Sequence, residues 1–291
     1  MSISKRSPRP PSLRLTERDQ DLLAALGSHR FLSVPQVVAL FFDSTSRAQT
    51  RLRQLHQGGL VIQVFVPVRP YDRKSHTVFA LSARGARLLS ELRGIPRPPH
   101  LCDSDRRSGL FLDHTLRRND VRICLELLDR TLPGFQLLVW KQKPEEVRAG
   151  AVVQTGARKR ERVPIVPDGF FAFRYLRQLH AFCLETDMGT VRLARMELRY
   201  KAYWKWWKEG GARRRFGPLP LRVLTMAPTD RRLDALRKAA MRAPEGGGRG
   251  SRLFWFAKLS AADLDGPEAL LSPAWQVATP GCNAPEPLIH P

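Results

Sequence analysis

Two acidic segments in the middle of the chain have the residue types and spacing of a site that binds a divalent metal. Asp168 lies in the segment VPDGFF, and Glu185 follows seventeen positions later in FCLETDMGT. Both segments have the apolar composition of strands, so a hairpin would bring the two carboxylates together. Adjacent carboxylates repel each other unless a cation binds them or one of them takes up a proton. A Mg²⁺ or Mn²⁺ ion held by Asp168 and Glu185 would activate water against a phosphodiester.

The elements around these acids alternate between helix and strand, which predicts an α/β domain with a mixed sheet over residues 109–277. A Pro-rich linker is expected at 95–108 and a flexible tail at 278–291. The apolar pattern predicts, in chain order, a helix at 110–132, strands at 135–141, 163–174 and 180–186, a helix at 191–209, a strand at 221–226, a helix at 230–241 and a strand at 253–259.

Aromatic residues alternate with lysines on the expected helix at 191–209. Such a pattern can stack on nucleic-acid bases, but this spacing more often packs a helix against a sheet. The packing interpretation is favoured for Tyr200, Tyr203, Trp204 and Trp207. Trp206 points in another direction on the helix and is expected to be exposed.

The first domain, residues 14–94, carries the signals of three short helices, a hairpin and a fourth helix. Thr16, Ser33 and Ser44 are good N-caps for the first three helices. The segments LVIQVFVPV and HTVFAL then predict two strands joined by the basic turn RPYDRKS. This order of elements is typical of a winged helix-turn-helix.

The third helix of this domain is expected to enter the major groove of double-stranded DNA. Ala48, Leu52 and Leu55 occupy its inward positions, so its polar residues remain for DNA. The candidate DNA-binding residues are Arg47, Gln49, Thr50, Arg51 and Arg53 on the helix, with Arg69, Arg73 and Lys74 on the wing. The alternative is a winged helix that contacts only protein, and the arginines of the helix argue against it.

The chain is strongly basic, with a formal net charge of +22. Such an excess repels itself, so a polyanionic partner is expected, and nucleic acid fits best. The charge is clustered: the first 13 residues form a basic, Pro-rich arm that we expect to be disordered, and two runs flank the acidic segments. These runs, Arg158, Lys159 and Arg160, and Arg213, Arg214 and Arg215, are either a phosphate-binding surface or simply solvated loops.

The order αβββαβ, with Pro-Asp on one strand and Glu on the next, resembles the PD-(D/E)xK nuclease fold. That resemblance implies metal ligation by Asp168 and Glu185. Asp187 stands where the family has its catalytic Lys, and Lys201 on the following helix is the candidate replacement. The resemblance therefore leaves open a metal-dependent DNA endonuclease or a degenerate, inactive derivative.

A wider resemblance extends from about residue 14 to 277. The segments LDHTLRRNDVRICLE, VPDGFF, FCLETDMGT, ELRYKAYWKW and LRVLTMAPTDRRLDAL are similar to the replication-relaxation family. This resemblance implies DNA replication or mobilisation on plasmids and other mobile elements, with replication or mobilisation proteins as partners. A non-catalytic transcriptional regulator or replication accessory is the alternative.

The expected compartment and oligomeric state rest on the absence of long apolar runs, on the spacing of the cysteines and on the expected helix-turn-helix. No apolar run approaches the ~20 residues that cross a bilayer, so no membrane association is expected. The four cysteines are far apart, which favours neither a zinc site nor a disulfide framework. A cytoplasmic protein associated with the nucleoid or a plasmid is expected. Because helix-turn-helix proteins often read two half-sites, a homodimer is a further expectation.

Overall fold

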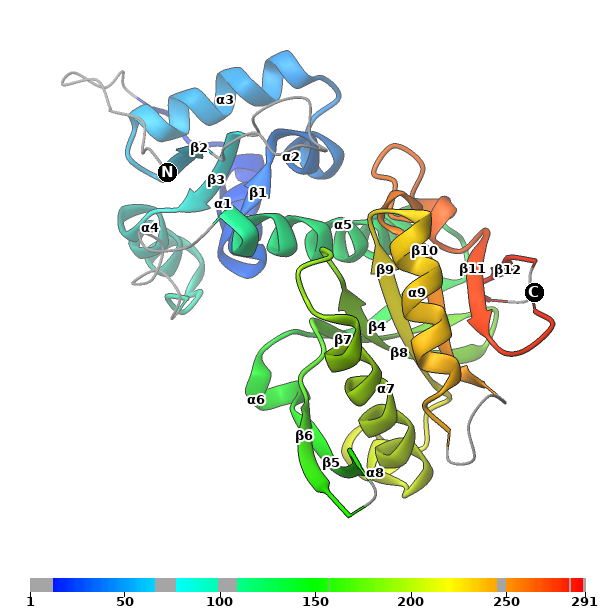
Figure 1. Cartoon of the computed structure of the whole chain (residues 1–291). Coiled ribbons are helices and arrows are strands. Elements are labelled where there is room, and N and C mark those ends of the chain that lie inside the picture. Colours follow the sequence, from blue (N-terminus) through cyan, green and yellow to red (C-terminus); the bar gives the residue numbers. More distant parts are fainter. Residues whose placement is uncertain are drawn as a thin grey trace. The chain divides into compact units, whose positions relative to one another are not determined.

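The chain is a mixed α/β protein, which confirms the predicted fold class (Figure 1). The computed structural model describes residues 13–65, 77–98, 109–156, 158–244, 250–282 and 284–289. Its contacts divide the chain into two compact units, Met1–Ile123 and Cys124–Pro291.

The first unit contains helices and a small antiparallel sheet in which the strands lie in the order β1-β3-β2. Val61 of β2 pairs with Leu81 of β3, and Leu32 of β1 pairs with Phe79 of β3. In chain order its elements are α1 (Glu17–His29), β1 (Leu32–Ser33), α2 (Val34–Phe41), α3 (Thr45–Gln57), β2 (Val61–Phe65), β3 (Thr77–Leu81) and α4 (Ala83–Arg93).

Two of the predicted helix starts are confirmed by capping boxes. Thr16 Oγ1 accepts a hydrogen bond from the Asp19 amide, and the Asp19 carboxylate accepts one from the Thr16 amide. Ser33 and Gln36 form the same reciprocal pair at the start of α2. Ser44 precedes α3 as predicted, but its side chain makes no capping hydrogen bond.

The boundary between the units falls inside the long helix α5 (Gly109–Thr131), later than the expected start of the second domain at residue 109. Leu112 and Leu116 of this helix belong to the apolar core of the first unit. Asn119 Nδ2 donates to the Phe31 carbonyl at 2.7 Å, and Gln36 Nε2 donates to Asp120 Oδ1 at 2.6 Å. These buried contacts explain why the first part of α5 packs with the N-terminal elements.

The second unit is built on a seven-stranded sheet of order β12-β11-β10-β9-β8-β7-β4. Neighbours β8, β9 and β10 run parallel, and the other pairs are antiparallel. The strands are β4 (Phe135–Lys141), β7 (Gly169–Tyr175), β8 (Gln178–Thr186), β9 (Leu221–Ala227), β10 (Ser251–Lys258), β11 (Pro273–Ala278) and β12 (Glu286–Pro287). Because β12 pairs with β11 and Leu288 is buried, part of the expected flexible tail belongs to the sheet.

Helices α7 (Leu193–Lys208) and α9 (Asp230–Met241) connect the parallel strands, because two parallel neighbours need a crossover connection. They pack against each other and share one core with the sheet face that bears Phe170, Cys183 and Phe254. Shorter elements complete the unit: α6 (Pro144–Val147), α8 (Gly211–Phe216) and two 3₁₀ turns, Leu259–Ala261 and Pro267–Leu270.

The single strand predicted at 163–174 is wrong, because the segment forms two strands in different sheets. Its first part belongs to β6 (Arg160–Ile165), which pairs with β5 (Ala149–Gln154) in a separate two-stranded ribbon, and its second part is β7. Pro167 lies between them and lacks the amide proton that a continuous ladder would need.

The predicted exposure of two tryptophans on α7 is reversed in the structure. Trp206 is buried against Phe216, with their rings edge to face at 6.0 Å, whereas Trp207 is 43% exposed. The reason is α8, which folds back on the end of α7. A Cβ at Gly211 would lie 2.2 Å from Trp206 Cδ1, so the close approach of α8 requires glycine there.

Candidate functional site

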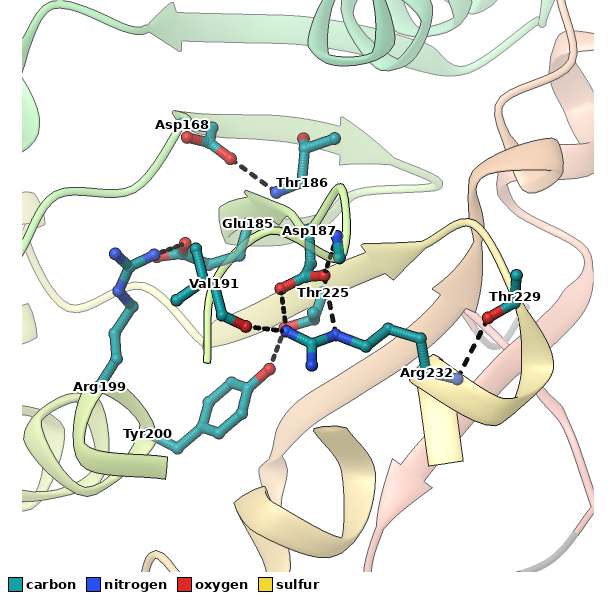
Figure 2. A network of polar contacts seen from close by, with 11 residues as sticks. Asp168, Glu185, Thr186, Asp187, Val191, Arg199, Tyr200, Thr225, Thr229 and Arg232 are labelled. Carbon is teal, nitrogen blue, oxygen red and sulfur yellow. Dashed lines mark hydrogen bonds and ion pairs between the residues drawn. The ribbon is translucent and has the colours of Figure 1, made fainter. Parts of the chain in front are cut away.

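Glu185 belongs to a buried polar network at the carboxyl end of β8, and Figure 2 shows it with Arg199. Its side chain is almost wholly buried beneath α7. Tyr203 donates its hydroxyl proton to Glu185 Oε1 at 2.6 Å, and Arg199 donates from Nη1 to Oε2 at 2.6 Å. Residues four apart lie on one helix face, so Arg199 and Tyr203 reach the same carboxylate, one at each oxygen.

Asp168 immediately precedes β7 and lies beside the end of β8. Gly169 pairs with Leu184 in the antiparallel ladder, and the Asp168 amide donates to the Leu184 carbonyl at 2.8 Å. The Asp168 carboxylate accepts from the Thr186 amide at 2.6 Å. The two strands therefore bring Asp168 next to the segment that carries Glu185, as the sequence predicted.

Asp187 is bound by Arg232 from the start of α9. Arg232 donates to both carboxylate oxygens, at 3.0 Å from Nε and 2.9 Å from Nη2, and also donates to the Val191 carbonyl (Figure 2). The Gly189 amide adds a further hydrogen bond at 2.6 Å. The planar guanidinium of Arg232 and the planar carboxylate of Asp187 thus form two parallel hydrogen bonds, which is the strongest common geometry for an arginine and a carboxylate.

The structure places Arg199, and not the predicted Lys201, beside Glu185. Lys201 Nζ lies 3.0 Å from Glu197 Oε1, and Arg242 binds the same glutamate. Two positions along a helix correspond to a rotation of about 200°, so Lys201 and Arg199 point in nearly opposite directions. Arg199 is the cation of α7 that contacts Glu185. The motif ELRYKAYWKW contained this signal, because Arg199 and Tyr203 have helical i, i+4 spacing.

Opposing effects act on the protonation of Glu185. Burial raises its pKa to about 7, and the nearby Asp168 carboxylate contributes in the same direction. The guanidinium of Arg199 and the hydroxyl of Tyr203 oppose that rise. Glu185 in turn raises the pKa of Arg199, so the guanidinium stays charged. The pair is held together by charge and hydrogen bonds in a site from which water is largely removed.

A second candidate site is the solvent face of α3 in the first unit. Ala48, Leu52 and Leu55 are buried, whereas Arg47, Gln49, Thr50 and Arg53 are all exposed. The sequence of the helix, TSRAQTRLRQLHQ, contains no acidic residue. Its exposed face is therefore positively charged and rich in hydrogen-bond donors.

The comparison with protein families is decisive for the classification. A family model described as replication-relaxation matches residues 23–221, which is more than half of the chain. The chain belongs to the replication-relaxation family. No curated protein and no solved structure matches it significantly.

The replication-relaxation match includes α3 and most of the buried network, but it ends before Arg232. Arg232 had no signal in the sequence, because its contact with Asp187 joins two elements that are far apart along the chain. Over the part of the chain that the structure describes, no helix is long and apolar enough to cross a bilayer.

Arg51 of this replication-relaxation protein has a structural role that the sequence did not indicate. It donates to both oxygens of Asp19, at 2.7 Å from Nε and 2.5 Å from Nη2, and also to Gln54 and the Arg14 carbonyl. Burial opposes the ionisation of Asp19, but the hydrogen bonds from Arg51 and Thr16 outweigh it and lower the Asp19 pKa. Arg51 thus joins α3 to the capping box of α1.

Two groups of the other predicted basic residues lie in the described part of the chain. Arg158, Lys159 and Arg160 are exposed at the turn between β5 and β6. Arg213, Arg214 and Arg215 are exposed on α8, where Arg214 binds the Glu209 carbonyl and Arg215 the Glu145 carbonyl. The wing residues Arg69, Arg73 and Lys74 fall outside the described residues.

The carboxylate network does not fit a divalent metal. Each oxygen of Glu185 already accepts a short hydrogen bond, and both oxygens of Asp187 bind one guanidinium. A metal at Glu185 would compete with Arg199, whose positive charge already neutralises the carboxylate. Among residues 13–65, 77–98, 109–156, 158–244, 250–282 and 284–289, no group of three His, Cys, Asp or Glu side chains is placed to hold a metal ion. The network instead fastens α7 and α9 to the ends of β8 and β9.

Proposed function

We propose that the protein binds double-stranded DNA through its first unit, as a winged helix-turn-helix, and acts in replication or mobilisation of a plasmid or other mobile element. Membership of the replication-relaxation family supports the process. The exposed face of α3 supports the mode of binding, because a helix that buries its apolar side and presents arginine and glutamine matches the major groove.

The α3 face carries the argument because its cations are available to phosphate. Arg47 pairs with Asp43, and both side chains are about 70% exposed. An exposed pair of this kind contributes about 0–1 kcal/mol, so a DNA phosphate can replace Asp43 at little cost. No described residue forms an ion pair with Arg53, and the helix contains no acid to repel DNA.

The second unit takes part in this function without a metal-dependent step at Asp168 and Glu185. Its carboxylates are bound by Arg199, Tyr203 and Arg232, so their contribution is to hold the sheet and helices together. The exposed arginines of this unit, including those at the β5–β6 turn, offer additional contacts to the DNA backbone.

Fluorescence anisotropy of the full chain on a labelled duplex of random sequence tests this proposal. Arg47→Ala and Arg53→Ala should each weaken binding, and the double variant should weaken it further. Arg84→Ala with Arg87→Ala provides the control, because these residues are exposed on α4 of the same unit. If the α3 variants bind as tightly as the wild type, α3 is not the recognition helix. If the wild type does not bind duplex DNA, the proposed function is wrong.

A further inference from the structure

The two-stranded ribbon of β5 and β6 has two faces of opposite character. Ala151, Val153, Val163 and Ile165 are buried on the inner face, which packs on α7. The outer face bears two directly opposed pairs, Val152 with Arg162 and Gln154 with Arg160. Figure 1 shows the ribbon beside α7 in the second unit.

The outer face combines the side chains that read base edges. Arginine can donate two hydrogen bonds to guanine, glutamine can bind adenine through two hydrogen bonds, and a small apolar group can contact the thymine methyl. Val152, 42% exposed, is next to a glutamine and two arginines. An exposed valine stabilises any surface strand through its β-propensity, and on a base-reading strand it also offers a contact to a thymine methyl.

The charges of the ribbon also favour a polyanion. Arg160 and Arg162 are exposed, and no described residue forms an ion pair with either of them. The one acidic residue of the ribbon, Glu161, lies on the inner side opposite Val153 and pairs with Arg195 of α7 at 3.2 Å. The charged residues of the outer face are therefore all cations. Exposed Arg158 and Lys159 extend the positive charge to the turn, which the Thr155 amide closes by donating to the Lys159 carbonyl.

We propose that the β5–β6 ribbon is a second DNA-reading element, which inserts its outer face into the major groove of duplex DNA. The strands of a ribbon lie about 4.8 Å apart, and a major groove about 12 Å wide admits two of them. Arg160, Arg162 and Gln154 contact base edges, Val152 contacts a thymine methyl, and Arg158 and Lys159 contact phosphates. This inference rests on the proposed function, since it assigns a second part of the same DNA-binding activity.

Two paired variants of the full chain test the ribbon. Arg160→Ala with Arg162→Ala removes the base-reading pair, and Arg158→Ala with Lys159→Ala removes the pair at the turn. Arg177→Ala with Arg231→Ala removes the same charge from exposed positions elsewhere in the second unit. The probes are a duplex selected by the wild type from a random pool and an unselected duplex of equal length. The measurements are the dissociation constants and the protection of guanine N7 from methylation.

Arg160 and Arg162, the base-reading pair, should contribute more to the affinity for the selected duplex than to the affinity for the unselected one. Loss of this pair should weaken binding to the selected duplex by about 10-fold or more, weaken binding to the unselected duplex less, and remove protection at specific guanines. Loss of the turn pair should weaken binding to both duplexes by a similar factor. The control pair should change the selectivity and the protection pattern little.

Other outcomes distinguish a failure of the ribbon proposal from a failure of the proposed DNA-binding function. The Arg160→Ala, Arg162→Ala variant could keep the full preference for the selected duplex and the full N7 protection while the α3 variants lose affinity. In that case the ribbon does not read DNA, and the proposed role of α3 in DNA binding stands. Such a result would assign the outer face to an acidic protein instead. If neither the ribbon variants nor the α3 variants change binding, both proposals are wrong.

Discussion

Arg199 Nη1 lies 2.6 Å from Glu185 Oε2, so a guanidinium from α7 neutralises a carboxylate that is buried at the end of β8. Tyr203 binds the other oxygen. The positive charge that balances the buried Glu185 carboxylate is therefore supplied by Arg199 of the same chain. Several measurable consequences come from that arrangement.

Arg199→Ala should strongly destabilise the protein. At a pH high enough to keep Glu185 ionised, removal of one partner of this buried ion pair leaves an uncompensated charge and costs about 3–5 kcal/mol. The partial exposure of Arg199 places the expected loss at the lower end of that range. Arg195→Ala is the matched control, because it breaks an exposed pair with Glu161 on the same helix and should cost about 1 kcal/mol or less. Urea denaturation of both variants measures the difference, and equal losses would contradict the role of Arg199.

The stability should depend on pH through Glu185. Burial raises its pKa in the folded chain to about 7, above the value of an unfolded glutamate. The folded state then binds the proton more tightly, so the contribution of Glu185 to stability is largest below about pH 4.5 and falls as the pH rises towards 7. Glu185→Gln should remove this dependence. Free energies of unfolding of both proteins between pH 4.5 and 7.5 provide the measurement, and a wild-type advantage that grows with pH would contradict the sign.

Divalent metals should leave the carboxylate network unchanged. Mg²⁺ or Mn²⁺ would have to compete with Arg199 and Tyr203 for Glu185, so millimolar metal should not raise the melting temperature of the free protein. EDTA-treated protein serves as the reference, and nicking of supercoiled DNA provides a second readout. A metal-dependent stabilisation or cleavage that Asp168→Ala abolishes would restore the nuclease hypothesis drawn from the sequence.

Two arginines of α3, two positions apart, should behave differently. Arg51→Ala breaks a bidentate contact with the buried Asp19 and should lower the free energy of unfolding by about 1.5–3 kcal/mol. Arg53 is exposed, so Arg53→Ala should change stability by about 0.5 kcal/mol or less while it weakens DNA binding. Chemical denaturation and anisotropy on the same samples separate the two effects. Equal stability of the two variants would show that the Asp19 contact is unimportant.

The sequence predicted those features that depend on local pattern. Thr16 and Ser33 stand immediately before amphipathic helices, and both cap them. The proximity of Asp168 to the end of β8 was also predictable, because two adjacent strands joined by a tight turn can pair in few ways.

Other features depend on tertiary contacts that no local pattern encodes. Residue type predicts Lys201 as the cation of the site, whereas the helix rotation decides which cation reaches Glu185. Trp206 is buried because α8 folds back on α7, which Gly211 permits. The ribbon strand β5 was missed because the small residues of AGAVVQ become strand-like only when they pair with β6 and pack on α7.

The most direct test of DNA binding through α3 is the salt dependence of that binding. The affinity of the wild type and of the Arg47→Ala, Arg53→Ala double variant should be measured on one duplex over a range of salt concentrations. Each phosphate contact that is lost should reduce the slope of log K against log salt by about 0.9, so the double variant should have a slope smaller by about 2. A double variant with the slope and affinity of the wild type would contradict the central claim.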